Sequence, residues 1–128
     1  MKVIQTGEAP APVGPYSQAV ESQGIIFVSG QVGIDPKTGK NVEGGIEKET
    51  EQALKNIQVI LKKAGLTLEN VAKVTVYLKD ITDFQSMNGV YSQVFSQHKP
   101  ARACVEANMV KDFRVEIDCI ATRDESAD

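Results

Sequence analysis

The fold is decided by one short stretch near the carboxyl end, Lys99-Pro-Ala-Arg-Ala-Cys-Val-Glu-Ala107. It has the pattern of a buried strand, and side chains two apart on a strand point to the same face. One face therefore carries Arg102, Cys104 and Glu106, and the other carries small apolar side chains. Pro100 cannot donate to a ladder and suits the position just before the strand. The pattern predicts an arginine held on a rigid element beside a thiol.

Arg102 is the first candidate for a functional residue. A guanidinium is a planar fork that grips a carboxylate with two parallel hydrogen bonds. Our hypothesis is that Arg102 holds the carboxylate of a small substrate and that the rest of the chain builds a pocket around it. The alternative is the ordinary role of a strand arginine, on the surface or in a structural ion pair.

Size and composition are those of one domain with an aliphatic core. The 128 residues predict a single domain over 1–128, and with 5% aromatic residues and no Trp the core must come from Val, Ile, Leu and Ala. The net charge of −3 argues against tight nucleic-acid binding, which needs a basic stripe. His98 is the only histidine, and no CxxC or HExxH motif occurs, so we expect no metal site and no histidine-based triad.

The sequence predicts a cytoplasmic protein. No apolar run reaches the length of a signal peptide or of a membrane span, so we expect no membrane partner. The two cysteines, Cys104 and Cys119, fall in predicted strands and are expected to project from opposite faces of the sheet. Two reduced thiols are typical of a cytosolic protein.

The remaining elements follow from hydrophobic periodicity and turn residues. Gly65 predicts a left-handed end to the first helix, and Thr82 with Gln85 forms a capping-box pattern at the second. We expect an edge strand at 1–6, a strand that starts with residues 16–20, and a strand that spans 24–32. These are followed by a helix at 46–64, a strand at 71–78, a helix at 83–97, and a closing hairpin of 102–107 and 113–122. The connecting segments are a proline-rich stretch at 8–15, turns at 22–24 and 35–40, and a tail at 124–128 with the composition of a disordered acidic segment.

Three positions inside these elements deserve separate predictions. Gly30 follows Ser29 in a strand, which predicts a β-bulge or a close approach of the backbone to another group. Strict alternation in that strand places Gln31 on the same face as Ile25. Asn88 lies inside the apolar stripe of the second helix, so its amide either ties the helix to a loop or faces a pocket.

The order of elements predicts an α+β domain with one mostly antiparallel sheet and two helices packed on one face. A hairpin turn centred near Met109 would set Arg102 roughly opposite Glu116, on one polar face. The other face of the sheet would lie open, with small and polar residues. A half-apolar open face usually meets another subunit, so we expect a closed homo-oligomer.

Several motifs, in this order along the whole chain, resemble the Rid family, RidA type. They are Gly14-Pro-Tyr-Ser-Gln-Ala19, Val28-Ser-Gly-Gln31, Asn88-Gly-Val-Tyr91 with Phe95, the stretch at 99–106, and Val115-Glu-Ile117. The resemblance implies a chorismate-mutase-like fold, a homotrimer, and a site in each cleft between subunits. It also implies hydrolysis of 2-aminoacrylate and related enamine or imine acids to 2-keto acids and ammonia, with no metal or cofactor.

The resemblance assigns roles to seven residues of this sequence. Arg102 matches the residue that binds the carboxylate, Glu116 the one that positions the hydrolytic water, and Cys104 a cysteine beside the substrate nitrogen. Cys104 has no histidine partner in the motif, so pocket lining is favoured over a nucleophilic role. The pocket residues are Tyr16, Ser29 and Asn88, with Gly30 contributing backbone.

The chain departs from the family pattern at the turn 108–112, which lacks the usual proline and is one residue shorter. Because the predicted site residues flank this turn, the change bears on substrate range and activity. Two other functions stay open at this point. One is a non-catalytic trimer that binds a small carboxylate on the same scaffold, and the other is RNA cleavage, which the charge and the single histidine argue against.

Overall fold

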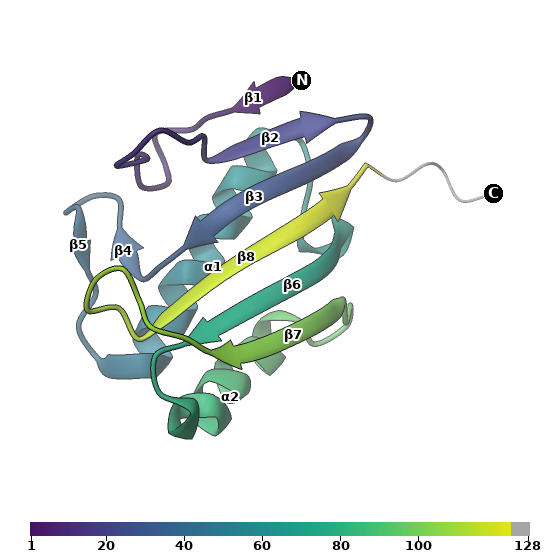
Figure 1. Ribbon diagram of the computed structural model, residues 1–128. Helices are drawn as coiled ribbons and strands as arrows, with labels where there is room; N and C mark the ends of the chain where they lie inside the picture. Colours follow the sequence, from purple (N-terminus) through teal and green to yellow (C-terminus); the bar gives the residue numbers. More distant parts are fainter. Residues whose placement is uncertain (124–128) are drawn as a thin grey trace.

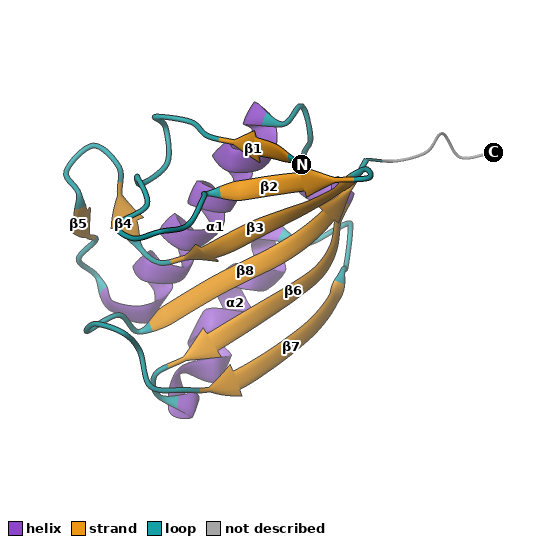
Figure 2. Ribbon diagram, turned by 45° about the horizontal axis from the view of Figure 1, so that its top comes forward, coloured by secondary structure: helices purple, strands orange, loops and turns teal. Residues whose placement is uncertain are grey.

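A six-stranded sheet carries two α-helices on one face and leaves the other face uncovered within the chain (Figure 1, Figure 2). The computed structural model describes residues 1–123, so the predicted acidic tail lies outside the described residues. The strands, in sheet order, are β1 (Lys2–Ile4), β2 (Ala19–Ser22), β3 (Ile25–Gln31), β8 (Val115–Thr122), β6 (Val71–Leu78) and β7 (Ala101–Glu106). The predicted α+β layout, with both helices on one face, is confirmed.

The helices are α1 (Gly45–Lys63) and α2 (Phe84–Val94), with short 3₁₀ turns η1 (Leu68–Asn70) and η2 (Ile81–Asp83). A small separate hairpin, β4 (Ile34–Asp35) and β5 (Lys40–Asn41), encloses the predicted turn at 35–40. All strand pairs of the large sheet are antiparallel except β6 with β7. The edge position of β1 and the turn before β3 are as predicted.

The predicted closing hairpin is wrong, because β6 lies between β7 and β8. The chain runs from β6 through α2 into β7, and a helical crossover returns the next strand parallel to the first. β8 then inserts between β3 and β6, where its alternate side chains are fully buried. The stretch at 99–107 is therefore an edge strand with no fully buried residue rather than a buried one.

Helix α1 supplies most of the core above the sheet. Its buried apolar side chains, Ala53, Leu54, Ile57, Ile60 and Leu61, have the predicted spacing. Gly65 ends the helix as predicted, with a φ of +80°. The N–H groups of Gly65 and Leu66 donate to the carbonyls of Lys62 and Leu61, which satisfies the last turn.

Helix α2 begins differently from the prediction. Thr82 is not its N-cap, because the chain first passes through the turn η2, which Asp80 caps by accepting from the Thr82 N–H at 2.9 Å. The Thr82 hydroxyl also donates to Asp80, at 2.7 Å, and is therefore not free to cap α2. The helix ends at Val94 rather than Gln97, because the backbone of Phe95 leaves the helical region, with a φ of −103° and a ψ of 57°.

The predicted bulge at Gly30 is confirmed, and it changes which way the next residue points. The pairing of β3 with β8 shifts register between Val28 and Gln31. The extra residue turns Gln31 inward, where its side chain is only 6% exposed. The prediction that Gln31 shares the face of Ile25 is therefore wrong.

Both cysteines lie on the helix-covered side, which corrects the predicted opposite faces. Cys104 aligns with Val76, and Cys119 aligns with Val74, so β6 separates them, and both thiols are free. Burial raises the pKa of the Cys119 thiol to about 12. The error has the same cause as the hairpin error, because β7 and β8 are not neighbours.

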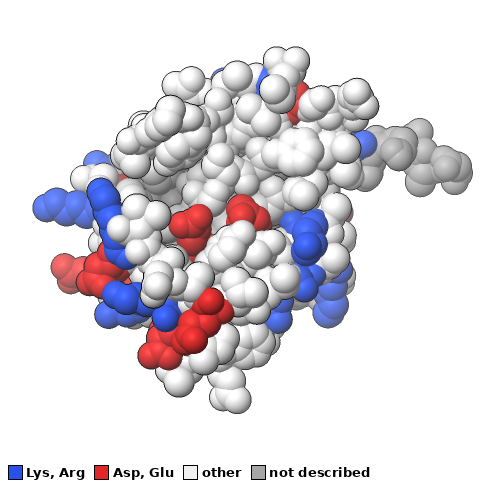
Figure 3. Space-filling view, viewed as in Figure 1, with Lys and Arg blue, Asp and Glu red and all other residues white. Residues whose placement is uncertain are grey.

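The uncovered face of the sheet mixes polar side chains, as predicted, with several exposed large apolar ones. Val3, Ile25, Phe27 and Val105 are large side chains with exposed fractions of 37% to 58%. Figure 3 shows this face, where uncharged side chains predominate and acidic groups stand near the middle. Exposed apolar surface of this kind usually marks a contact with another protein surface.

Candidate active site

Arg102 stands on β7 and points to the helix side of the sheet, toward α2. Its Nη1 donates to Asn88 Oδ1 at 2.7 Å, and its Cζ lies 4.6 Å from the centre of the Tyr91 ring. A second ring, Phe84, lies 5.7 Å from the same carbon. Two of the predicted site residues, Arg102 and Asn88, are thus in contact at one groove of about 430 Å³, which we call the arginine half-site. It is lined by Asn88, Tyr91, Ser92, Phe95, Ser96, Lys99, Pro100 and Arg102.

Arg102 differs from the other two arginines of the chain in having no carboxylate beside it among residues 1–123. Arg114 pairs with Glu49 at 2.6 Å, and Arg123 pairs with Glu21 at 2.8 Å. Within residues 1–123, the Nε and Nη2 groups of Arg102 have no hydrogen-bond partner. A half-buried guanidinium with a free edge is well suited to bind a carboxylate from outside the chain.

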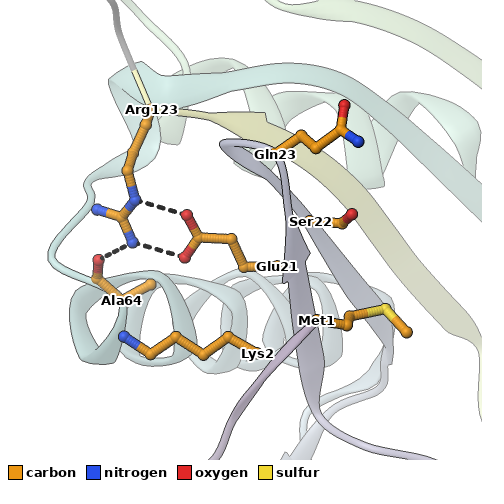
Figure 4. A pocket seen from close by; sticks show the side chains of 7 residues that line it. All are labelled: Met1, Lys2, Glu21, Ser22, Gln23, Ala64 and Arg123. Carbon is orange, nitrogen blue, oxygen red and sulfur yellow. Dashed lines mark hydrogen bonds and ion pairs between the residues drawn. The ribbon is translucent and has the colours of Figure 1, made fainter.

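A separate depression of about 740 Å³ lies at the carboxyl end of β8, and its lining contains no candidate site residue (Figure 4). Arg123 there donates two hydrogen bonds to the Glu21 carboxylate and a third to the Ala64 carbonyl. These bonds tie the end of β8 to β2 and to the end of α1. The role of this pair is structural.

Glu116 lines a different cleft, which we call the glutamate half-site. Its volume is about 460 Å³, and its lining comes from the proline-rich loop, the bulge of β3, the loop before β8 and Glu116 itself. The lining includes Pro10, Pro12, Val13, Tyr16, Gln18, Ser29, Gly30, Val110, Lys111, Phe113 and Glu116. Four predicted residues, Tyr16, Ser29, Gly30 and Glu116, therefore meet here. Burial, with a smaller contribution from the charge of Asp118, raises the pKa of Glu116. A carboxylate of raised pKa is a better proton acceptor.

Gly30 is needed for this arrangement, because a Cβ there would overlap the Glu116 carboxylate. Ser29 donates its hydroxyl to the Ser17 carbonyl at 2.6 Å and thereby holds the segment that leads to Tyr16. The Tyr16 side chain is 50% exposed at the rim. The bulge thus gives the carboxylate its space.

Gln18 was not predicted as a site residue, although it organises the wall of the cleft. Its side chain is 2% exposed and bonds the N–H and carbonyl of Thr6 and the carbonyls of Ala9 and Pro10. These bonds hold the proline-rich loop, which has few partners of its own. An amide that lies between a proline-rich segment and the start of a strand is the sequence signal that identifies such a residue.

Cys104 lies two residues beyond Arg102 on the same face and packs against the core. Burial raises the pKa of its thiol, and the nearby Arg102 charge only partly opposes this. The thiol is therefore protonated at neutral pH, and a protonated thiol is a poor nucleophile. This electrostatic setting favours the pocket-lining role.

The two half-sites lie on opposite faces of the sheet. Arg102 aligns with Val74 and faces the helices, whereas Glu116 aligns with Tyr77 and alternates with the buried Val115 and Ile117. The prediction that Arg102 and Glu116 stand opposite each other on one face is wrong. A site that uses both residues must take them from two copies of the chain.

The profile of the endoribonuclease L-PSP family matches residues 6–123, nearly all of the chain. The chain belongs to this family. A RutC family protein of Pyrococcus horikoshii is 50% identical over 124 residues, which cover 96% of this chain and 98% of that protein. The human 2-iminobutanoate/2-iminopropanoate deaminase is 48% identical over 121 residues, 94% of this chain and 88% of that protein.

Solved structures of this L-PSP family agree with the fold. The structure of Escherichia coli TdcF with bound serine has a TM-score of 0.92 and 36% identity, and covers 97% of this chain and 100% of that one. A conserved Rid family protein of Yersinia pestis has a TM-score of 0.92 and 42% identity, with 95% and 98% covered. The predicted Rid-type membership is confirmed.

Two features of residues 1–123 bear on the candidate partners. Residues 1–123 contain no group of three or more His, Cys, Asp or Glu side chains arranged to hold a metal ion. Neither helix described is long and apolar enough to cross a membrane.

Proposed function

We propose that this chain is a hydrolytic deaminase that converts small 2-imino acids and their enamine forms, such as 2-aminoacrylate, into 2-keto acids and ammonia. The observation that carries the proposal is the half-buried Arg102 guanidinium, preset by Asn88 and without a carboxylate within residues 1–123. The names of the bovine and human relatives, 50% and 48% identical, support this substrate class. The proposed site uses no cofactor.

The proposed reaction needs a fixed substrate and a placed water. Arg102 holds the carboxylate, and a water bound at Glu116 attacks C2 of the protonated imine. Glu116 accepts a proton from that water and passes it to the nitrogen of the tetrahedral intermediate. The C–N bond then breaks and ammonia leaves, while Glu116, again a free carboxylate, takes the remaining hydroxyl proton, so that the oxygen from water becomes the keto oxygen. Proton acceptance of this kind is worth roughly 10²–10⁴-fold in rate.

We further propose that the working form is a homotrimer, with each site built between two subunits. One subunit supplies Arg102, Asn88 and Cys104, and its neighbour supplies Glu116 with the cleft that holds Gly30, Ser29 and Tyr16. The open face supports this assembly, because it exposes Phe27 and Val105 in a single chain. In a closed ring, each copy contributes its arginine half-site to one neighbour and its glutamate half-site to the other. No half-site is then left without a partner.

The first experiment generates 2-aminoacrylate from serine with a lyase and measures pyruvate release with and without the protein. Arg102→Ala and Glu116→Gln should each abolish most of the acceleration. Arg123→Ala is the matched control, since it also removes one positive charge but lies in the structural pair with Glu21. No acceleration by the unaltered protein, or equal acceleration by Arg102→Ala, would reject the proposal.

A second experiment tests whether two copies share a site. The inactive Arg102→Ala and Glu116→Gln chains are co-expressed at equal levels and assayed as a mixture. A random mixture should recover about one quarter of the full activity, because each site has one chance in four of receiving both intact halves. A mixture as inactive as either parent would show that the site does not combine halves from two copies.

A non-catalytic carboxylate-binding role is the second candidate, and the structure of E. coli TdcF with bound serine favours it. In that case Arg102→Ala would lose ligand binding, while the unaltered chain would not accelerate pyruvate release. RNA cleavage is not proposed. The ring of His98 contacts the Val71 carbonyl at 2.6 Å and lies outside both half-sites, and the chain has a net charge of −3.

A further inference from the structure

The guanidinium of Arg102 lies against the ring of Tyr91, which has no role in the proposed reaction steps. The Cζ atom is 4.6 Å from the centre of the Tyr91 ring, within the range of a cation–π contact. The Tyr91 ring in turn packs against Phe95, with 4.9 Å between ring centres. Tyr91 is 7% exposed, so it cannot swing away from its place on α2.

We infer that Tyr91 is a positioning residue that sets the plane of the Arg102 guanidinium for the incoming carboxylate, an inference that rests on the proposed function. Contact of Cζ with the ring restricts the tilt of the guanidinium, and the hydrogen bond from Nη1 to Asn88 Oδ1 restricts its rotation. The edge formed by Nε and Nη2 is left free. That edge matches the two oxygens of a carboxylate.

The physical effect of Tyr91 is to reduce the freedom that Arg102 loses when it binds. A long arginine side chain has many rotamers, and ordering it before the ligand arrives strengthens binding. The effect is exerted on ground state and transition state alike, since the carboxylate is held in both. A change at Tyr91 should therefore raise KM and leave kcat nearly unchanged.

The ring rather than the hydroxyl carries this role. The Tyr91 hydroxyl is buried and has no hydrogen-bond partner among the described residues. Tyr91→Phe keeps the ring and should leave KM within about 2-fold of the unaltered protein, whereas Tyr91→Leu removes the ring and should raise KM about 3- to 30-fold. Tyr91→Leu should weaken the binding of 2-oxobutanoate, measured by titration calorimetry, in the same proportion, whereas Tyr91→Phe should bind it as the unaltered protein does.

Met87→Ala is the matched control for lost helix packing. Met87 is fully buried on the same helix but does not line the arginine half-site. This variant should lose thermal stability and keep KM within about 2-fold. The inference is overturned if Tyr91→Leu leaves KM unchanged, if Tyr91→Phe raises KM as much as Tyr91→Leu, or if Met87→Ala raises it equally.

Failure of the inference can be told apart from failure of the proposed function. If the unaltered chain deaminates 2-aminoacrylate and Tyr91→Leu has the same KM, the proposed function stands and the positioning role is wrong. If the unaltered chain binds 2-oxobutanoate without deaminating 2-aminoacrylate, and Tyr91→Leu binds it about 3- to 30-fold more weakly, the positioning role stands and the proposed function is wrong.

Discussion

A single methyl group added at Gly30 should displace the proposed catalytic carboxylate without unfolding the protein. The new Cβ would lie 2.7 Å from Glu116 Cδ and 3.0 Å from its Cγ, and would overlap Oε2. The φ of Gly30 is not in the left-handed region, so alanine adds no backbone strain. The crowded atoms belong to the end of a flexible side chain, so the carboxylate should swing away while the sheet stays in place.

The two expected magnitudes are very different. A misplacement of about 1 Å can reduce a rate about 10²-fold, and loss of a general base reduces it by roughly 10²–10⁴-fold. We therefore expect Gly30→Ala to lower kcat about 10²-fold or more. The free energy of unfolding should change by less than about 1 kcal/mol, as for a substitution that moves only a side chain.

The assay measures kcat for 2-aminoacrylate hydrolysis together with thermal unfolding at equal protein concentration. Gly7→Ala is the control, because no atom lies within 4 Å of the Cβ added there, and it should change neither quantity. Gly30→Ala with full activity would refute the reasoning, since Glu116 would not be needed at its observed position. A large fall in the melting temperature would show that the backbone, and not the side chain, had moved.

Three further predictions concern charge and burial. Asp118→Asn should move the acid limb of the pH profile of kcat/KM to lower pH, because the Asp118 charge adds to burial in raising the pKa of Glu116. An acid limb that stays in place would assign the titration to another group. Glu49→Ala should lower the melting temperature by roughly 5–10 °C, because the buried Glu49 carboxylate accepts hydrogen bonds from the backbone N–H and the guanidinium of Arg114. An unchanged melting temperature would contradict this stabilising role of Glu49. Tyr91→Phe should raise the free energy of unfolding in urea by up to about 1 kcal/mol, because it removes a buried hydroxyl without a partner among the described residues. A clear loss of stability would show that the hydroxyl has a partner.

Local patterns in the sequence were sufficient for the class of fold and for half of the site. Helical spacing identified α1, and alternation identified the buried face of β6. Gly30 was predicted to mark a bulge or a close approach, and the structure has both there, because only a residue without a side chain suits that place. The position of Asn88 in an apolar stripe correctly marked an amide with a specific partner, which is Arg102.

The order of strands was decided only in three dimensions. Alternation shows which side chains share a face of one strand, but it does not show which strand lies beside it. The short distance in sequence between β7 and β8 favoured a hairpin, whereas the crossover through α2 placed β7 beside β6. The register shift at Gly30, which turned Gln31 inward, likewise depended on the pairing with β8.

The sequence by itself determined which residues are candidates for the chemistry, because arginine, glutamate and glycine have properties that do not depend on the fold. Only the tertiary structure decided that Arg102 and Glu116 point away from each other, on opposite faces of one sheet. The physical reason is that the face of a side chain is set by the burial of its neighbours, and burial is a property of the whole packed chain. The separation of the two half-sites is what makes a second copy necessary for the proposed reaction.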